Sequence, residues 1–564
     1  MKGTNKMVAL PDGLTLGSPS PTRGRSVLAS KAFSPGSVIA VFAHGEGAPS
    51  IAIPDNPHLA RTCHYCMAIA SDQDPSATSP VHVRACTGCR TVYYCSPKCQ
   101  KADWALAHGR GECKAFRRVR APDPASSEKG EDTSQLVLPT PVRTLVQVLV
   151  RPEIQAAMAE VEGHVETVHA TDPDVTWAGM ELQARAALHY LNREMSKSNL
   201  AEAMEIMCKL KVNSFNRLDA DIGQSGTYFN SALAMVNHSC IPNAFVQFIG
   251  RAAILHAYQE IKKGEEIEIS YIESTLHRSQ RQEALKTRYH FECACPRCKE
   301  DLDVYQVCAR YPHLELNLFS LVPDLDKLRH PPVKQHLQSN ESLQKYIEEI
   351  YPNCTESLQG TPLPEKSKLL RQRWELCARL RQAELYAVDP LTQVIVEASI
   401  YFCEQANFPY ALALSCFLAL RSDPHRGPMP FHGPRVKGML MVAKLLANTA
   451  ATAPSTAQPG SLPARLSQAL GKMDQATMCQ TVLAIVAHYG PAAHSAEWPV
   501  YRQASGLLKD LESLPGRDAE NAVVAAFARN PTRAEEAEFF KLMVLDRIRE
   551  LAGFALEIMD AEFA

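Results

Sequence analysis

The segment that decides the fold is residues 237–243, which reads Asn-His-Ser-Cys-Ile-Pro-Asn. A cluster of three cysteines follows it with the spacing Cys-x-Cys-x2-Cys: Cys293, Cys295 and Cys298. Three thiolates are one ligand short of a closed tetrahedral zinc site, so a fourth ligand must come from elsewhere in the chain. Cys240 is the obvious donor, and Cys208 and Cys308 are rival donors. The pattern therefore predicts a structural zinc; a cysteine-rich helix end without metal is the alternative.

A larger set of metal-ligand residues lies upstream: Cys63, Cys66, Cys86, Cys89, Cys95, Cys99, His108 and Cys113. Two or three intervening residues let both sulfurs of a pair face one ion at the zinc–sulfur distance of ~2.3 Å. Eight ligands make two closed sites, which is the structural rather than the catalytic arrangement. Because few large apolar side chains surround them, metal rather than an apolar core is expected to fold this segment. A set of free buried cysteines is the disfavoured alternative, since paired spacings of this kind rarely arise by chance.

Composition limits the function classes. A chain of 564 residues with 46% hydrophobic residues is expected to form more than one globular domain. A formal charge of −2 argues against strong nonspecific binding to nucleic acid, which needs a basic surface. No apolar run approaches the length that spans a bilayer, and the N-terminus lacks a sustained apolar segment. We therefore expect an intracellular protein of the nucleus, the cytoplasm or both, in which the 18 cysteines bind metal rather than form disulfides.

Periodicity predicts strands first and helices later. The best strand is 38–42, and short strands return between 226 and 272. The Pro/Ser-rich, charged stretch 121–135 is typical of an exposed linker. Apolar residues at helical spacing predict these helices: 141–150, 177–195, 199–211, 391–405, 408–420, 434–448, 474–488, 499–512 and 534–553. No clean 34-residue repeat is visible, so the pattern alone does not establish a repeat architecture.

These motifs resemble those of a known family. The segment 237–243, followed by Gly-Glu-Glu-Ile at 264–267 and Ile-Ser-Tyr at 269–271, is similar to the signature of SET-domain methyltransferases. Phe-Glu-Cys-Ala-Cys-Pro-Arg-Cys at 291–298 resembles their post-SET metal segment, and Arg-Gly-Arg-Ser at 23–26 resembles the opening of the same fold.

The upstream cluster resembles a MYND finger, including Val-Tyr-Tyr-Cys at 92–95 and Trp104 before His108. A MYND finger inserted into a SET domain defines the SET–MYND family. The resemblance covers about residues 20–300, and the motifs follow in the family's order.

The resemblance implies an α+β multidomain fold. The expected parts are the N-terminal part of a SET domain at 8–62, a MYND finger at 63–113, a linker and helical SET insert at 114–225, the C-terminal part of the SET domain at 226–288, a post-SET zinc segment at 289–300, and an α-helical TPR-like domain at 301–564.

The resemblance also implies three zinc ions. In the finger the ligands interleave: Cys63, Cys66, Cys95 and Cys99 hold one ion, and Cys86, Cys89, His108 and Cys113 hold the other. The chain departs from the family in two places. A polar insertion occupies 71–80, and four residues separate His108 from Cys113 where the family usually has three.

The implied activity is S-adenosylmethionine-dependent N-methylation of lysine in a protein, whether histone or non-histone. Tyr271 is the implied catalytic residue. The implied cofactor-binding residues are Arg23, Arg25, Asn213, Asn237, His238, Tyr271 and Phe291. Ser26 stands where the family often has glycine. MYND fingers generally bind proteins, so the alternative function is a catalytically weak or inactive interaction scaffold or transcriptional regulator. No membrane partner and no nucleic-acid partner are expected.

The chemistry explains why an aromatic site suits this reaction. Methyl transfer is an in-line displacement, so orienting the amine and the sulfonium supplies much of the acceleration. The attacking lysine must be neutral, and deprotonating it at pH 7 costs about 4–5 kcal/mol from its ordinary pKa of ~10.4. A dry aromatic channel lowers that cost by disfavouring the ammonium form. Tyr271 would orient the amine. Either Tyr271 or water would remove the proton.

Overall fold

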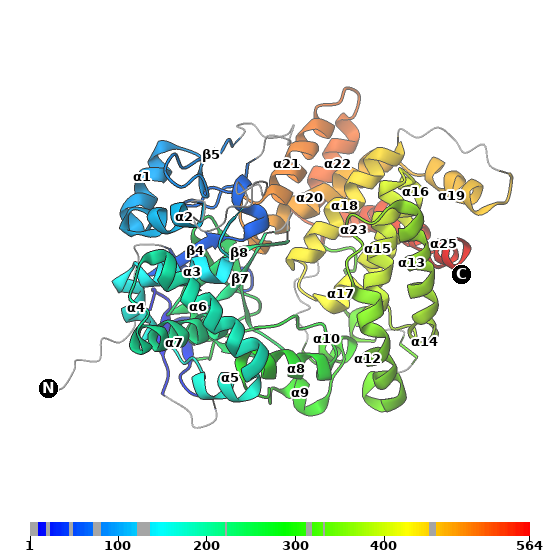
Figure 1. Ribbon diagram of the computed structural model, residues 1–564. Coiled ribbons are helices and arrows are strands. Elements are labelled where there is room, and N and C mark those ends of the chain that lie inside the picture. Colours follow the sequence, from blue (N-terminus) through cyan, green and yellow to red (C-terminus); the bar gives the residue numbers. More distant parts are fainter. Residues whose placement is uncertain are drawn as a thin grey trace. The chain divides into compact units, whose positions relative to one another are not determined.

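The computed structural model describes residues 10–18, 23–43, 49–70, 81–120, 136–219, 223–311, 319–330, 333–334, 336–450 and 458–564. The chain divides into two compact units, coloured along the sequence in Figure 1. The first comprises Met1–Tyr271 and Gln282–Cys293, and the second Ile272–Arg281 and Ala294–Ala564. The insertion at 71–80 and the linker at 121–135 lie outside the described residues.

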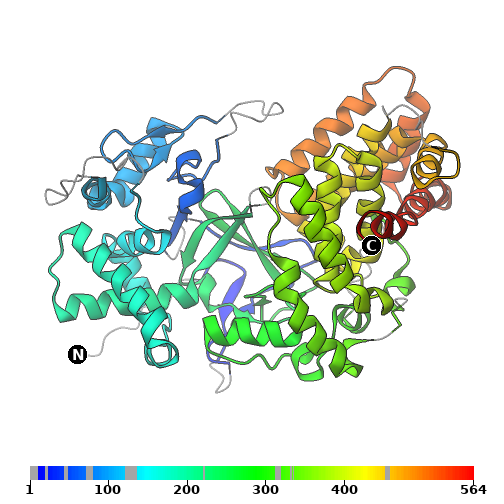
Figure 2. The same cartoon turned by 45° about the vertical axis from the view of Figure 1, so that its right-hand side comes forward.

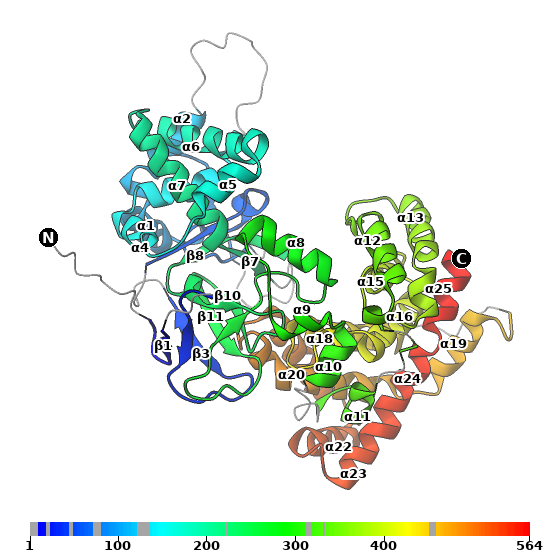
Figure 3. The same cartoon turned by 90° about the horizontal axis from the view of Figure 1, so that it is seen from below.

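The first unit contains small sheets. Strands β1 (Leu14–Leu16) and β2 (Val27–Ala29) pair with each other, as do β5 (Arg84–Ala85) and β6 (Tyr93–Tyr94). A three-stranded sheet has the order β10 (Ala244–Ile249), β11 (Ala252–Ala257), β3 (Val38–Phe42), and Figure 3 shows it beside β1. A second has the order β4 (Ser50–Pro54), β8 (Gly223–Asn230), β7 (Phe215–Asp219). Strand β9 (Asn237–His238) runs parallel to β12 (Glu268–Ile269). The strand predicted at 38–42 is confirmed.

The helices of this unit precede and follow the strands. In the finger region these are α1 (Pro97–Leu106) and α2 (Glu112–Arg120). After it come α3 (Thr140–Leu149), α4 (Pro152–Met158), α5 (Val165–Thr171), α6 (Ala178–Leu191) and α7 (Lys197–Asn213), drawn in cyan and teal in Figure 2. Helix α8 (Arg278–Tyr289) crosses the unit boundary along the chain. The three helices predicted from periodicity in 141–211 are therefore present as α3, α6 and α7.

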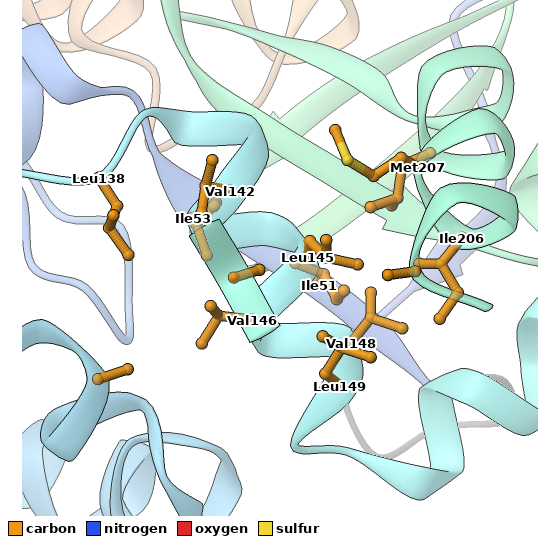
Figure 4. Packing of buried hydrophobic residues seen from close by; sticks show 14 of the residues in the cluster. Ile51, Ile53, Leu138, Val142, Leu145, Val146, Val148, Leu149, Ile206 and Met207 are labelled. Carbon is orange, nitrogen blue, oxygen red and sulfur yellow. The ribbon is translucent and has the colours of Figure 1, made fainter. Parts of the chain in front are cut away.

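Strand β4 separates two apolar cores, because successive side chains of a strand point to opposite faces. Ile51 and Ile53 face the helical layer, and Figure 4 shows them among side chains of α3 and α7, including Leu145. Ala52 faces the other way, and Tyr228, its partner on β8, belongs to the same second core. The sheet of β4, β8 and β7 is thus the wall between the helices and the remaining strands.

Two buried arginines, Arg143 and Arg151, and the half-buried Arg251 cover the outer edge of β4. An edge strand presents unpaired carbonyl groups that a folded protein must cover. The bonds are Arg151 Nη1 to the Ser50 oxygen at 2.9 Å, Arg251 Nη1 to the Ala52 oxygen at 3.4 Å, and Arg143 Nη2 to the Pro54 oxygen at 2.7 Å. Arg251 also donates to the Tyr65 oxygen at 3.0 Å, which ties the finger to the sheet. Side chains therefore close this edge.

Arg143→Met is expected to lower the free energy of unfolding by about 1–3 kcal/mol, because it leaves the buried Pro54 carbonyl without its donor. The control is Arg110→Met, whose ion pair with Glu153 is partly exposed and contributes about 1 kcal/mol or less. Urea denaturation followed by circular dichroism measures both. Equal losses in the two variants would show that the Arg143 contact does not stabilise the edge.

His256 on β11 makes stability depend on pH. Its ring stacks on Phe245 with the centroids 5.1 Å apart, and burial lowers its pKa to about 4. The unfolded group keeps a pKa of ~6.5, so the unfolded state binds more protons between these values and stability falls as the pH falls. Between about pH 7 and about pH 5, His256 should lower the free energy of unfolding of the parent protein by about 2 kcal/mol. We expect this part of the loss to be absent in His256→Phe. Urea denaturation at both pH values tests this. Identical pH dependence in both proteins would contradict it, because zinc release in acid affects both alike.

The second unit is helical, as predicted. Its helices are α9 (Pro296–Glu300), α10 (Val304–Arg310), α11 (Leu325–Arg329), α12 (Glu341–Thr355), α13 (Leu363–Leu376), α14 (Ala378–Gln382), α15 (Leu391–Glu404), α16 (Phe408–Arg421), α17 (Asp423–Arg426), α18 (Gly433–Ala450), α19 (Leu462–Gly471), α20 (Gln475–Ala493), α21 (Pro499–Glu512), α22 (Asp518–Arg529), α23 (Ala534–Phe539), α24 (Asp546–Ala552) and α25 (Ala555–Phe563). The helix predicted at 534–553 is confirmed: α23, a wider turn at Phe540–Leu545 and α24 follow one another without a break from Ala534 to Ala552. Its likeness to TPR domains stays a prediction. Within the described ranges, no helix has both the length and the apolar character needed to cross a bilayer.

Candidate active site and metal centres

The segment 237–243 forms one wall of a polar and aromatic site. Asn237 and His238 make up β9, whose register sets Asn237 against Glu268 and His238 against Ile269. The Ser239 amide donates to the Ile269 oxygen at 3.0 Å, which extends the pairing by one residue. The motif at 269–271 therefore lies directly beside the motif at 237–243.

Tyr271 is fixed at both ends. Its hydroxyl donates to the Val236 carbonyl oxygen at 2.6 Å, and its amide donates to His238 Nδ1 at 3.0 Å. Burial raises the pKa of the phenol, and the neighbouring Tyr289 raises it further. The hydroxyl is therefore protonated at neutral pH. One of its hydrogen-bonding directions is used on Val236, and its oxygen keeps the capacity to accept a hydrogen bond.

The contacts of His238 determine its tautomer. A backbone amide can only donate, so Nδ1 accepts from Tyr271 and the proton of the neutral ring sits on Nε2. Nε2 lies 3.3 Å from Cys240 Sγ, so it can donate to that sulfur. His238 therefore connects the backbone of Tyr271 to a cysteine of the third metal cluster, described below.

The loop at 23–26 contacts the same segment. Asn237 Nδ2 donates to Glu266 Oε1 at 2.8 Å and to the Arg25 oxygen at 2.9 Å. The Arg23 guanidinium pairs with Glu266 at 3.2 Å and with Glu268, and it donates to the His238 oxygen at 3.2 Å. The loop at 23–26 is thus held against β9 and β12 by charge and by backbone contacts.

Arg25 and Asn213 both reach the loop that follows α4. Arg25 pairs with Glu160 at 3.6 Å. Asn213, the last residue of α7, donates from Nδ2 to the Glu162 oxygen at 2.7 Å and to the Lys209 oxygen at 2.8 Å. Because Asn237 also donates to the Arg25 oxygen, these contacts join α7 and the loop at 160–162 to the rest of the site.

Aromatic rings cover the site. The Phe291 ring lies 5.9 Å from that of His238 and 6.4 Å from that of Tyr271, between centroids, and 36% of Phe291 is exposed. Tyr289 packs on Tyr271 at 4.8 Å and donates to the Tyr271 oxygen at 3.2 Å. Sequence reasoning missed Tyr289. The available signal was an aromatic residue two positions before Phe291, at the end of a helical pattern.

Asn243 is a second residue whose role the sequence did not reveal. Its Oδ1 accepts from the Glu268 amide at 2.8 Å, and its Nδ2 donates to the Glu266 oxygen at 2.8 Å. One side chain thereby fixes the backbone of both acidic residues that hold Arg23. Its place at the end of the 237–243 motif was the only signal.

A cavity of about 470 Å³ lies in the same unit. Its lining is largely apolar and includes Pro141, Thr144, Val175, Thr176, Gly179, Met180, Gln183, Met207, Leu210, Lys211, Ser214, Thr227 and Arg288. Ser214 follows Asn213 in the chain, and Arg288 precedes Tyr289. Two of the segments that line the cavity therefore continue along the chain into residues of the site.

The finger brings its eight predicted ligands together in two groups. The first, the all-cysteine finger cluster, is Cys63, Cys66, Cys95 and Cys99; the second, the histidine-containing cluster, is Cys86, Cys89, His108 and Cys113. In each group the ligand atoms lie within 4.8 Å of one another. A hydrogen bond from Cys66 lowers the pKa of the Cys63 thiol to about 5, and one from Cys89 lowers that of Cys86 to about 3. Both donor sets suit closed tetrahedral zinc sites.

The third group contains Cys240, Cys293, Cys295 and Cys298, with ligand atoms within 4.8 Å of one another. The sulfurs of Cys240 and Cys293 are 4.0 Å apart. The rivals Cys208 and Cys308 are buried outside this group, and burial raises their thiol pKa values to about 11 and about 12. Three groups of four ligands fit the predicted three zinc ions.

Comparisons with known proteins match the part of the chain that contains this site. The family model described as SET domain matches residues 24–272. The chain is 33% identical over 248 residues to "SET domain and MYND-type zinc finger protein 6" of Schizosaccharomyces pombe, covering 44% of this chain and 45% of the relative. It is 28% identical over 285 residues to "Histone-lysine N-methyltransferase ASHR1" of Arabidopsis thaliana, covering 49% and 53%. The chain spans about half the length of these curated relatives.

Solved structures add little to these matches. One, described as "Crystal structure of the SET domain of LSMT bound to Lysine and AdoHcy", is 12% identical with a TM-score of 0.22, covering 98% of this chain and 95% of that one. A TM-score this low supports no argument about the site.

Proposed function

Residues 24–272 of this chain are a SET domain, and on that premise we propose that the protein is an S-adenosylmethionine-dependent protein lysine N-methyltransferase. The observation that carries the proposal is the position of the Tyr271 phenol. It is half-buried, protonated and held by Val236, and it is surrounded by the rings of His238, Tyr289 and Phe291.

The residues around Tyr271 fit the cofactor. S-adenosylmethionine, when bound, supplies a methyl group on a positively charged sulfur. Asn237, His238 and the loop with Arg23 and Arg25 would hold its amino-acid end, together with Asn213. Phe291, which is partly exposed, would cover its adenine. The contacts between Asn237, Arg25 and the loop at 160–162 support this proposal, because they keep these separate segments in one fixed arrangement.

The residues of the site orient the substrate amine and keep water away from it. The Tyr271 hydroxyl donates a hydrogen bond to the Val236 carbonyl. Its oxygen can therefore accept a hydrogen bond from an N–H of the substrate amine, which would point the nitrogen lone pair toward the methyl group. The rings of Tyr271 and Tyr289 form an apolar wall that disfavours an ammonium ion and so lowers the cost of having a neutral lysine. Orientation of this kind supplies a large part of the acceleration in a displacement reaction.

The substrate we propose is a polypeptide rather than free lysine. The cavity of about 470 Å³ lies in the same unit, and polar and apolar side chains line it, including Met180, Lys211 and Arg288. Free lysine would leave such a cavity without an occupant, whereas side chains that flank a lysine in a peptide can fill it. The structure favours neither histone nor non-histone substrates.

The remaining proposals follow the domain arrangement expected from sequence. The SET domain would consist of 8–62 and 226–288, with a MYND finger at 63–113, a helical insert at 114–225 and a post-SET segment at 289–300. The helical region at 301–564 would be TPR-like. The finger would bind protein partners, and the protein would act in the nucleus, the cytoplasm or both.

The test is cofactor binding combined with methyl transfer. Titration calorimetry of the full chain with S-adenosylmethionine is expected to give saturable one-site binding. Labelled S-adenosylmethionine with a protein extract is expected to give labelled protein bands in which amino-acid analysis finds methyl-lysine. Absence of cofactor binding at high micromolar concentration would overturn the proposal and leave the interaction scaffold as the function.

A further inference from the structure

A buried chain of hydrogen bonds leads from helix α3 into the finger. Gln147, on α3, donates from Nε2 to Glu112 Oε1 at 2.7 Å. The other oxygen of this carboxylate, Oε2, lies 2.8 Å from His108 Nδ1. His108 Nε2 in turn lies 3.4 Å from Cys86 Sγ and 3.6 Å from Cys89 Sγ. The chain of hydrogen bonds thus ends at the histidine-containing cluster.

The three side chains that make these hydrogen bonds are buried. His108 and Glu112 have no exposed surface, and Gln147 has 2%. A buried carboxylate is costly unless several donors satisfy it. Glu112 has one donor from the finger and one from α3, and the charge of Arg143, one turn before Gln147 on that helix, also attracts it. These donors therefore hold the Glu112 carboxyl group in a fixed position.

The chemistry of a histidine ligand explains what the carboxylate does. Nε2 is the ring nitrogen that faces the sulfurs, so its lone pair must be free for the metal ion and the proton must sit on Nδ1. A carboxylate can only accept a hydrogen bond, so Glu112 selects this tautomer and fixes the rotation of the ring. A negative charge on the far side of the ring also makes Nε2 a better donor to the metal.

The spacing of the ligands makes this arrangement possible. The MYND pattern usually has three residues between its histidine and its last cysteine, so the position four residues after the histidine is the cysteine itself. Here four residues intervene, and Glu112 occupies that position. A short turn at 108–110 and Gly111, whose φ is 143°, connect His108 to Glu112 at the start of α2, and this turn brings the carboxylate against the ring.

We infer that Glu112 and Gln147 are positioning residues for the second zinc ion of the finger, so that a helix outside the finger controls how firmly the finger holds this metal. Gln147 keeps the Glu112 carboxylate in the plane that His108 needs. The inference does not depend on methyl transfer, and its readout is the metal itself.

The experiment uses zinc release from the full chain. Gln147→Leu keeps the volume of the side chain and removes its donor. Glu112→Gln keeps an acceptor for His108 Nδ1 but removes the negative charge. Thr144→Val is the matched control, because it removes a hydrogen bond within α3 without touching Glu112. A colorimetric chelator measures the rate at which each protein releases zinc, and cobalt(II) substitution reports the ligand field of the histidine-containing cluster separately from the two all-cysteine clusters.

In both Gln147→Leu and Glu112→Gln, we expect one zinc equivalent of the three to leave about 10–100-fold faster. We also expect a change in the cobalt absorption of the histidine-containing cluster alone. Thr144→Val is expected to release zinc as the parent protein does. Unchanged release in both variants would overturn the inference. So would faster release from all three clusters together, because that would mark general loosening of the fold rather than control of one ion.

Discussion

Replacing Tyr271 with phenylalanine is expected to lower the rate of methyl transfer by about 100-fold while leaving the affinity for S-adenosylmethionine unchanged. The variant keeps the ring, which packs 4.8 Å from Tyr289 and 5.2 Å from His238. It removes only the hydroxyl, which is held by Val236 and would orient the substrate amine. The loss should therefore fall on kcat.

The measurement is the initial rate of label transfer from S-adenosylmethionine, with cofactor affinity from calorimetry. Tyr190→Phe is the matched control, because Tyr190 is a half-buried tyrosine on α6 of the same unit with no placement in the site. Equal rates for Tyr271→Phe and the parent protein would remove Tyr271 from the chemistry. An equal loss in Tyr190→Phe would show that the effect is not specific to the site.

The second large effect is expected from Cys240→Ser. Removing this ligand should reduce the zinc content from three ions per chain to two, because three thiolates cannot close the tetrahedral site. Cys240 also lies 3.3 Å from His238 Nε2, so the turn that carries Asn237 and His238 loses its anchor. We expect the affinity for S-adenosylmethionine to fall by at least about 10–100-fold, the range seen when residues supporting metal ligands are changed.

Metal analysis by mass spectrometry and calorimetry test this prediction together. Cys208→Ser is the control, because Cys208 is fully buried in α7 and lies outside the third cluster. It should keep three zinc ions and full cofactor affinity. Three zinc ions retained in Cys240→Ser, or one lost in Cys208→Ser, would mean that the third cluster has a different fourth ligand.

Local spacing was sufficient to predict the chelating pairs and most of the long helices. Cys63 and Cys66, or Cys293 and Cys295, are so close in the chain that only a few backbone conformations separate them, and metal geometry selects among these. The helix predicted at 499–512 is α21 itself, because apolar periodicity is a property of neighbouring residues. The helix predicted at 534–553 likewise runs from Ala534 to Ala552, through a wider turn at Phe540–Leu545.

Partners that are distant in the chain were beyond this reasoning. The motif with Asn237 and His238 indicated a cofactor site, but nothing in the sequence indicated that Glu266 and Glu268 would hold Arg23. Arg23 is 243 positions from Glu266 and 245 positions from Glu268 in the sequence. Which carboxylate pairs with which guanidinium depends on the tertiary path that brings residues 266–268 beside the loop at 23–26. Periodicity carries no information about that path.

The sequence by itself determined that this protein has three clusters of metal ligands, an N-terminal half of short strands and helices, and a helical C-terminal half. It also indicated the short segments that carry Asn237, His238 and Tyr271. Only the tertiary structure decided how these segments work together. It put the proton of the neutral His238 ring on Nε2, brought Tyr289 against Tyr271, and set Gln147 behind the histidine ligand of the finger. The physical reason is that spacing constrains neighbours, whereas a buried polar group takes as its partner whatever residue the folded chain brings within hydrogen-bonding distance.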